Sequence, residues 1–359
     1  MRITSQNNIQ YSIKKPKEQA FKGYFACPIK EVHFQTSNFM NPKGVYEELS
    51  KKCLKFFNIL VQDSDGIKEP SDLVYKNFLW NKNTVKNPLK NRWGQDNKVF
   101  LSETELGIFR GHRANGLADK FAKHLRLDVV EINTPIIGGN CFLGFNNNGK
   151  KFALLGEDAL YLTTKYRISE QLNIHPKNIF IIPQPDFHID MAIRPLNYPY
   201  VLVGDPELSL DLLKKSSNIS HKKLKKVKAS IDMRLAENIE NNYASVKTTI
   251  NNLEQNGFVP IRVPGLGGES ELNYMNAIVH QDTDGKLVYI TNKSSSNLEL
   301  EQIFRQHLKD NVPQIKEVVF IEADDYLSQS LKVDGGGLHC LVCERPDFEK
   351  WNAQLKSVK

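Results

Sequence analysis

Late in the chain, residues 335–343 read Gly-Gly-Gly-Leu-His-Cys-Leu-Val-Cys. Three consecutive glycines let the backbone adopt positive φ angles and pack closely against a neighbour or a substrate. The apolar run at residues 338–343 predicts a strand, so Cys340 would lie at the junction between a loop and that strand. A cysteine presented there suits a nucleophile. The alternative is a buried cysteine in a final core strand.

A histidine and a carboxylate stand two residues apart in the segment Phe187-His188-Ile189-Asp190. The pattern at residues 189–193 predicts a strand, in which side chains alternate between the two faces. His188 and Asp190 would then share a face and supply an acid/base group and an anionic anchor for a cation. The alternative is an ordinary surface pair.

Two earlier clusters carry weaker signals. In Trp93-Gly94-Gln95-Asp96 an aromatic ring stands near a carboxylate, which suits a planar cation that stacks on the ring and donates to the carboxylate. The alternative is a loop aspartate beside a core tryptophan. The cluster Ile137-Gly138-Gly139-Asn140 is also consistent with a tight strand entry.

In this order the clusters resemble the motifs of the pentein, or guanidine-modifying, superfamily, which includes agmatine, arginine and protein-arginine deiminases. The matching segments span residues 93–343 and are Trp93 to Asp96 for Trp-x-x-Asp, Gly138-Gly139-Asn140 for Gly-Gly-Asn/Asp, His188-Ile189-Asp190 for His-x-Asp, Asn273-Tyr274-Met275-Asn276 for Tyr-x-Asn, and Gly335 to Cys340 for Gly-Gly-Gly-x-His-Cys. The last motif is the most specific, and the shared order is stronger than any one motif.

The resemblance implies an α/β fold of five αβ modules arranged as a propeller around a central active site. We expect a polar tail at residues 1–19 and a single catalytic domain at residues 20–359. Residues 20–84 match nothing in the family, so they would form a first module with an insertion or a helical cap over the site.

The resemblance also implies hydrolysis of a guanidino group to a ureido group plus ammonia. Cys340 would attack the guanidinium carbon, and His188 would protonate the departing ammonia and then activate water. Asp96 and Asp190 would clamp the guanidinium nitrogens. The expected substrate-binding residues are Trp93, Gly337, Asn140 and Arg194.

Some features depart from the family pattern. Ile137 replaces an acidic residue that many members carry before Gly-Gly, which leaves the substrate contact made there open. The chain has no room for the immunoglobulin-like domains of animal protein-arginine deiminases, so no calcium is implied, and no other metal or cofactor is expected. The Gln95-Asp96 pair favours arginine within a polypeptide over a small molecule such as agmatine.

Other functions compete with hydrolysis. An amidinotransferase would use the same covalent intermediate, and a catalytically silent member would act as a binding protein. A thiol redox pair, Cys340 and Cys343, fits poorly because such pairs usually begin a helix. A zinc site also fits poorly, since no second Cys/His pair has a suitable spacing.

Composition bounds these readings. The chain has 359 residues, 40% hydrophobic and 25% charged, which is typical of a globular protein rather than a disordered one. No apolar run is long enough for a membrane-spanning helix. The net charge of +7 is smaller than is usual for nucleic-acid binding. Five scattered cysteines make no disulfide framework, and no Sec-type signal is visible, so we expect a cytoplasmic protein, with export by another route left open.

Short apolar runs alternate with amphipathic stretches through most of the chain. The strands are predicted at residues 25–34, 98–101, 128–132, 140–145, 152–155, 179–183, 189–193, 200–203, 259–263, 276–279, 287–290, 317–321 and 338–343. The helices are predicted at residues 45–60, 115–124, 168–172, 220–255 and 298–308. The cluster Lys222–Lys228 within the long helix suggests either a solvated face or a docking patch for an acidic protein.

Overall fold

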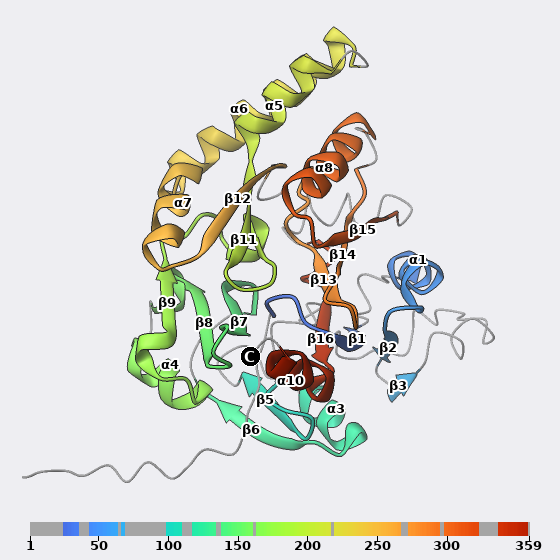
Figure 1. Cartoon of the computed structure of the whole chain (residues 1–359), viewed down its shortest axis with the longest axis vertical. Coiled ribbons are helices and arrows are strands. Elements are labelled where there is room, and N and C mark those ends of the chain that lie inside the picture. Colours follow the sequence, from blue (N-terminus) through green and yellow to red (C-terminus); the bar gives the residue numbers. More distant parts are fainter. Residues whose placement is uncertain are drawn as a thin grey trace, which may run out of the picture.

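The computed structural model describes residues 24–35, 43–63, 66–68, 98–109, 117–133, 138–160, 163–216, 219–266, 272–294, 298–322 and 337–357. Within these ranges the strands form five separate small sheets rather than one continuous sheet (Figure 1). The prediction of a mixed α/β protein with many short strands is therefore confirmed.

The five sheets share one pairing pattern: a first strand lies antiparallel to a middle strand, which lies parallel to a third strand. The first strands are β4 (Lys98–Phe100), β7 (Cys141–Phe145), β10 (Ile193–Pro195), β13 (Ile278–Gln281) and β16 (Val342–Pro346). The middle strands are β5 (Glu105–Phe109), β8 (Lys151–Gly156), β11 (Tyr200–Asp205), β14 (Leu287–Asn292) and β1 (Ile29–Gln35). The third strands are β6 (Asp128–Ile132), β9 (Ile179–Ile182), β12 (Val259–Pro264), β15 (Ile315–Ile321) and β2 (Asn58–Asp63), the last extended by β3 (Gly66–Lys68).

Helices connect the middle strand to the third strand in every sheet, because two parallel strands cannot be joined by a tight turn. The connecting helices are α1 (Lys43–Cys53), α3 (Leu117–Leu125), α4 (Lys165–Leu172), the series α5 (Pro206–Lys215), α6 (His221–Glu240) and α7 (Val246–Gln255), and α8 (Leu298–Asn311). A further helix, α10 (Phe348–Ser357), follows β16. Figure 1 shows α6 on the outer side of the molecule, with its lysine-rich first half extending beyond the sheets.

The sheet β16-β1-β2-β3 joins opposite parts of the sequence. Val32 pairs with Glu344, and the side chain of Arg345 binds Glu31 at 3.0 Å across 314 residues of sequence. The core is built from the buried faces of the sheets and their helices, with Phe142, Tyr289 and Phe304 among its fully buried side chains. Within the described ranges, no helix is long and apolar enough to cross a membrane.

Two predicted helices need correction. The helix expected at residues 45–60 ends at Cys53. Farther along, buried Phe57 and Ile59 alternate with exposed Asn58, a period of two that is typical of a strand, and β2 begins at Asn58. The helix expected at residues 220–255 is split into α6 and α7. Asn242 adopts a left-handed backbone with φ 61°, and Ser245 caps α7 by accepting from the N–H of Thr248.

Three predicted strands near the expected site start later than their apolar patterns suggested. Of the strand predicted at residues 189–193 only Ile193 lies in a strand, because Ile189–Met191 form the 3-10 turn η4 and β10 begins at Ile193. The argument that His188 and Asp190 share a strand face therefore does not hold. The strands predicted from residues 338 and 276 begin at Val342 and Ile278. Strands β2, β3 and β5 and helices α5 and α10 were missed.

Candidate functional site

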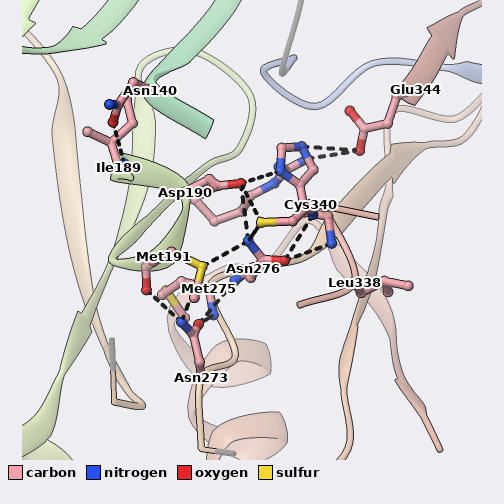
Figure 2. Close-up of polar contacts among 12 residues, drawn as sticks. Asn140, Ile189, Asp190, Met191, Asn273, Met275, Asn276, Leu338, Cys340 and Glu344 are labelled. Atoms are coloured by element: carbon pink, nitrogen blue, oxygen red, sulfur yellow. Dashed lines mark hydrogen bonds and ion pairs between the residues drawn. The ribbon is translucent and has the colours of Figure 1, made fainter. Parts of the chain in front are cut away.

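Cys340 lies in the turn that leads into β16, and its side chain is buried at 3% exposure. Its Sγ atom is 3.0 Å from Asn276 Nδ2 and 3.6 Å from Asp190 Oδ2 (Figure 2). Phe187 and Met191 pack against the same thiol. The predicted nucleophile thus meets an amide donor and a carboxylate in one buried place.

The amide group of Asn276 organises this turn. Its Oδ1 atom accepts from the backbone N–H groups of His339 at 2.8 Å and Cys340 at 3.2 Å, which fixes the orientation of the amide. Its Nδ2 atom therefore faces Cys340 Sγ, Asp190 Oδ2 at 3.1 Å and Met191 Sδ at 3.2 Å. An amide nitrogen has two hydrogens for these three acceptors. Loss of the thiol proton would therefore draw one hydrogen toward Sγ.

Asp190 lies in η4, immediately before β10, and its side chain is fully buried. Its Oδ2 atom accepts from Asn276 and lies 2.8 Å from His339 Nδ1. With Asp190 ionised, His339 Nδ1 would be the donor in this contact, because an ionised carboxylate only accepts hydrogen bonds. The carboxylate is thus oriented by two donors from different parts of the chain.

A buried ion pair lies behind His339. Arg194 Nη2 binds Glu344 Oε1 at 3.1 Å, and both side chains are nearly inaccessible to solvent. Glu344 Oε1 is 4.0 Å from His339 Nε2, and the guanidinium of Arg194 lies 5.4 Å from the ring of Phe142. The expectation that Arg194 binds substrate stays a prediction. Its guanidinium is already paired with Glu344, which favours an indirect role in which Arg194 acts through Glu344 on His339.

His188 lies in the segment between β9 and β10, where its backbone is extended. A Cβ atom at Gly139 would lie 2.5 Å from His188 Nδ1, so the ring packs on the glycine backbone. Asn140 holds the same segment, since its Oδ1 atom accepts from the N–H of Ile189 at 3.0 Å and from Gln184 Nε2 at 2.8 Å. Asn140 is therefore placed as a support for the His188 segment.

The predicted site residues fall into two groups. The structure brings Cys340 and Asp190 together. His188 lies two residues before Asp190 on the same segment, and Asn140 holds that segment from the residue before β7. Gly337 packs against the amides of Asn292 and Asn276, where a Cβ atom would lie 2.8 Å and 2.9 Å from the nearest atoms. The remaining predictions, Trp93, Asp96, Gly335 and Gly336, lie outside the described residues.

Asn140, Asp190, Asn276 and Cys340 each stand just before the first strand of a sheet. Asn140 directly precedes β7, Asn276 and Cys340 lie two residues before β13 and β16, and Asp190 lies three residues before β10. Residues from distant parts of the sequence thereby occupy corresponding positions in similar sheets. The sequence analysis assigned no role to Asn276, His339 or Glu344. The Tyr-x-Asn resemblance could have pointed to Asn276, and the position next to Cys340 could have pointed to His339.

The other cysteines face different surroundings. Burial raises the pKa of Cys53 to about 12 and also raises the pKa of Cys27, which keeps both as thiols. Cys343 contacts the carbonyl oxygen of Lys98 at 3.7 Å, away from the contacts of Cys340. Within the described ranges, no cluster of three or more His, Cys, Asp or Glu side chains could hold a metal ion.

Comparison with known proteins bears on the fold. No family model matches the sequence, and no curated protein matches it either. The chain superposes on the agmatine deiminase of C. jejuni with a TM-score of 0.56 and 15% identity, covering 91% of this chain and 95% of that one. The agmatine deiminase of Enterococcus faecalis gives a TM-score of 0.55 and 12% identity, covering 91% and 96%. The chain thus has the mixed α/β fold of these two agmatine deiminases, and the predicted likeness to deiminases is confirmed at the level of fold.

Proposed function

We propose that this protein is a guanidine-modifying enzyme that hydrolyses a guanidino group to a ureido group and ammonia. The observation that carries the proposal is the meeting of Cys340 Sγ with Asn276 Nδ2 and Asp190 Oδ2 at 3.0 Å and 3.6 Å. A nucleophile beside a fixed carboxylate suits a substrate that is a permanent cation with several planar donors.

The five sheets would form a closed five-module propeller within a single domain at residues 20–359. The shared strand pattern and the pairing of β16 with β1 support this arrangement. The propeller arrangement also gives a place for Asp96. In the sequence Asp96 stands two residues before β4, just as Cys340 stands two residues before β16. By that correspondence Asp96 would face the same centre and provide the second carboxylate, with Trp93 beside it.

The reaction proceeds through a covalent intermediate. The Cys340 thiolate attacks the guanidinium carbon, an S–C bond forms, and the C–N bond to one terminal nitrogen breaks. His188 gives that nitrogen the proton with which it leaves as ammonia. His188 then takes a proton from water as the water oxygen attacks the amidino carbon, and the S–C bond breaks to restore the thiolate.

Asp96 and Asp190 would hold the guanidinium nitrogens so that the carbon lies at attack distance from sulfur. Asn140 would support the segment carrying His188, and Gly337 would let the substrate approach the backbone of the nucleophile turn. The chain superposes on agmatine deiminases and on a structure titled a putative peptidyl-arginine deiminase, so agmatine and arginine derivatives are the first substrates to test.

The test compares wild type with Cys340→Ala and, as a matched control, Cys343→Ala. Ammonia and ureido product would be measured with free arginine, agmatine, a blocked arginine peptide and an arginine-bearing protein. We expect release on at least one substrate that is lost in Cys340→Ala and retained in Cys343→Ala. Formation of a new guanidino product on an added amine, with release of the donor's amine and without ammonia, would establish an amidinotransferase. Silence on all substrates, with no Cys340 adduct by mass spectrometry, would contradict the proposal.

The acidic partner expected at Lys222–Lys228 stays a prediction. Lys223 already binds Glu299 at 3.0 Å, and Lys228 binds Asp232 at 2.7 Å, so part of the basic charge is balanced within the chain. Reversing the charge of Lys222, Lys225 and Lys226 should lower activity on a protein substrate and spare activity on agmatine. Equal activity on both substrates would remove the partner from consideration.

A further inference from the structure

The segment between β9 and β10 carries both His188 and Asp190, and it is held from two sides. On the inner side Asn140 accepts from Ile189, as described above. On the outer side the segment contacts the corner between α6 and α7, where the N–H of Ala244 donates to the carbonyl oxygen of Gln184 at 2.7 Å. The proposed reaction uses nothing on this outer side.

Asp186 is the main outer contact. Its side chain is fully buried, its Oδ1 atom accepts from the N–H of Phe187 at 2.9 Å, and its Oδ2 atom accepts from Arg234 Nη2 of α6. Burial raises the pKa of Asp186 to about 6, while the guanidinium of Arg234 opposes that shift. The carboxylate therefore depends on Arg234 for its charge, and it stands two residues before His188.

Arg234 is itself fixed in place. It is 4% exposed, its Nη1 atom binds Glu237 Oε2 at 2.8 Å, and its guanidinium lies 5.9 Å from the ring of Tyr243. A planar guanidinium held at both nitrogens is a rigid support, because little rotational freedom remains. Through Arg234, helix α6 thus contacts the segment that carries two predicted catalytic groups.

We propose that Arg234 is a positioning residue that holds His188 and Asp190 in place through Asp186. The inference rests on the proposed function for its effect on activity, but its effect on the segment is independent of any substrate. Because a displacement of about 1 Å can reduce a rate on the order of a hundredfold, loss of this support should lower kcat far more than it alters KM.

The chain offers a matched control in Arg262 and Asp205. Asp205 is buried, accepts from the N–H of Leu208 at 2.9 Å and binds Arg262 Nε at 2.5 Å. Asp205 is the last residue of β11, and Arg262 lies on the neighbouring strand β12. Asp205 caps α5, which carries no predicted catalytic group. Both arginines therefore bind a buried aspartate that caps local backbone. They differ in what that backbone carries, and also in exposure, since the side chain of Arg262 is 54% exposed and that of Arg234 only 5%.

The experiment compares Arg234→Gln with Arg262→Gln. Amide hydrogen exchange would be followed by mass spectrometry over residues 184–192, with kcat and KM measured on the best substrate. We expect faster exchange in that segment and a fall in kcat of roughly tenfold to a hundredfold in Arg234→Gln only. Unchanged exchange there, or an equal kcat loss in both variants, would overturn the proposal.

Arg234→Lys guards against simple unfolding of the glutamine variant. It keeps the charge that Asp186 needs but loses the planar contact with Glu237. We expect near-normal thermal unfolding with a measurable kcat loss, whereas full wild-type kcat would overturn the positioning role. An inactive wild type would contradict the proposed function, and the exchange comparison would still decide whether Arg234 holds the segment.

Discussion

Replacing Asn276 by aspartate would remove the amide hydrogens from the candidate site while preserving the shape of the side chain. The remaining oxygen could still accept from the N–H groups of His339 and Cys340, now at 2.8 Å and 3.2 Å. The bonds lost are those to Cys340 Sγ at 3.0 Å and Asp190 Oδ2 at 3.1 Å. The substitution therefore keeps the acceptor that supports the turn, removes the donor and adds a second carboxylate beside Asp190. The added negative charge also disfavours the thiolate, so the effect worked out from the lost hydrogen bond is a lower bound.

The size of the effect follows from the charge on sulfur. A hydrogen bond to a charged group contributes about 1.5–3 kcal/mol, so its loss should reduce the thiolate fraction of Cys340 about tenfold to a hundredfold at a given pH. The midpoint of Cys340 alkylation against pH should move up by about one to two units. Asn276→Ala should also destabilise the fold, because it leaves two buried N–H groups unsatisfied at about 1–3 kcal/mol each.

The assay is alkylation of Cys340 by iodoacetamide, resolved by site with mass spectrometry and run beside ammonia release. Asn292→Asp is the matched control, since Asn292 Oδ1 accepts from the N–H of Leu338 at 2.9 Å and its amide donates to Asn273 rather than to Cys340. We expect a shifted alkylation midpoint for Asn276→Asp only. An equal shift in both variants would refute the reasoning, because Asn276 would then act only by holding the turn.

Three further outcomes are expected. Gly139→Ala places a Cβ atom 2.5 Å from His188 Nδ1 and should displace the His188 ring. We expect kcat/KM to fall at least about tenfold with little change in the unfolding midpoint. Unchanged kcat/KM would argue against a role for His188. Burial raises the pKa of Glu301 to about 7, so the folded state binds its proton more tightly than the unfolded state, and this group lowers stability as pH rises from about 4.5 to 7. Glu301→Gln should therefore gain stability over wild type in urea unfolding at about pH 8 but not at about pH 5, and an equal gain at both would contradict this origin. Arg194→Gln leaves Glu344 buried without its cation and should lower the free energy of unfolding in urea by about 3–5 kcal/mol. The double variant Arg194→Met with Glu344→Leu should lower it less. The reverse order would show that the pair is not what stabilises this region.

Apolar patterning located most of the fold in the sequence. The strand at residues 128–132 was predicted with the bounds that β6 has, and most other strands differ by one or two residues. Errors gathered where local geometry changes, as at residues 189–191, where an apolar run forms a 3-10 turn. The apolar spacing there fits a strand equally well, so sequence pattern could not separate the two.

The candidate site was predictable only where single residues carry recognisable chemistry. Cys340, His188 and Asp190 stood out because their side chains suit catalysis. His339 and Arg234 did not, because their partners Asp190 and Asp186 are 149 and 48 residues away in sequence. Arg234 lies on a lysine-rich helix that looks solvated from its composition, so its burial depends on packing that the sequence pattern does not reveal.

The pairing of β16 with β1 sets an order in which the protein can mature during synthesis. Strand β1 is made first, yet its antiparallel neighbour emerges from the ribosome some three hundred residues later, together with the turn that holds Cys340. Until then one edge of β1 stays open to pairing with other chains. Synthesis of β16 therefore supplies the thiol of Cys340 and closes that edge at the same time. A nascent chain stalled before β16 would lack the proposed nucleophile and would keep an open edge that is prone to aggregation.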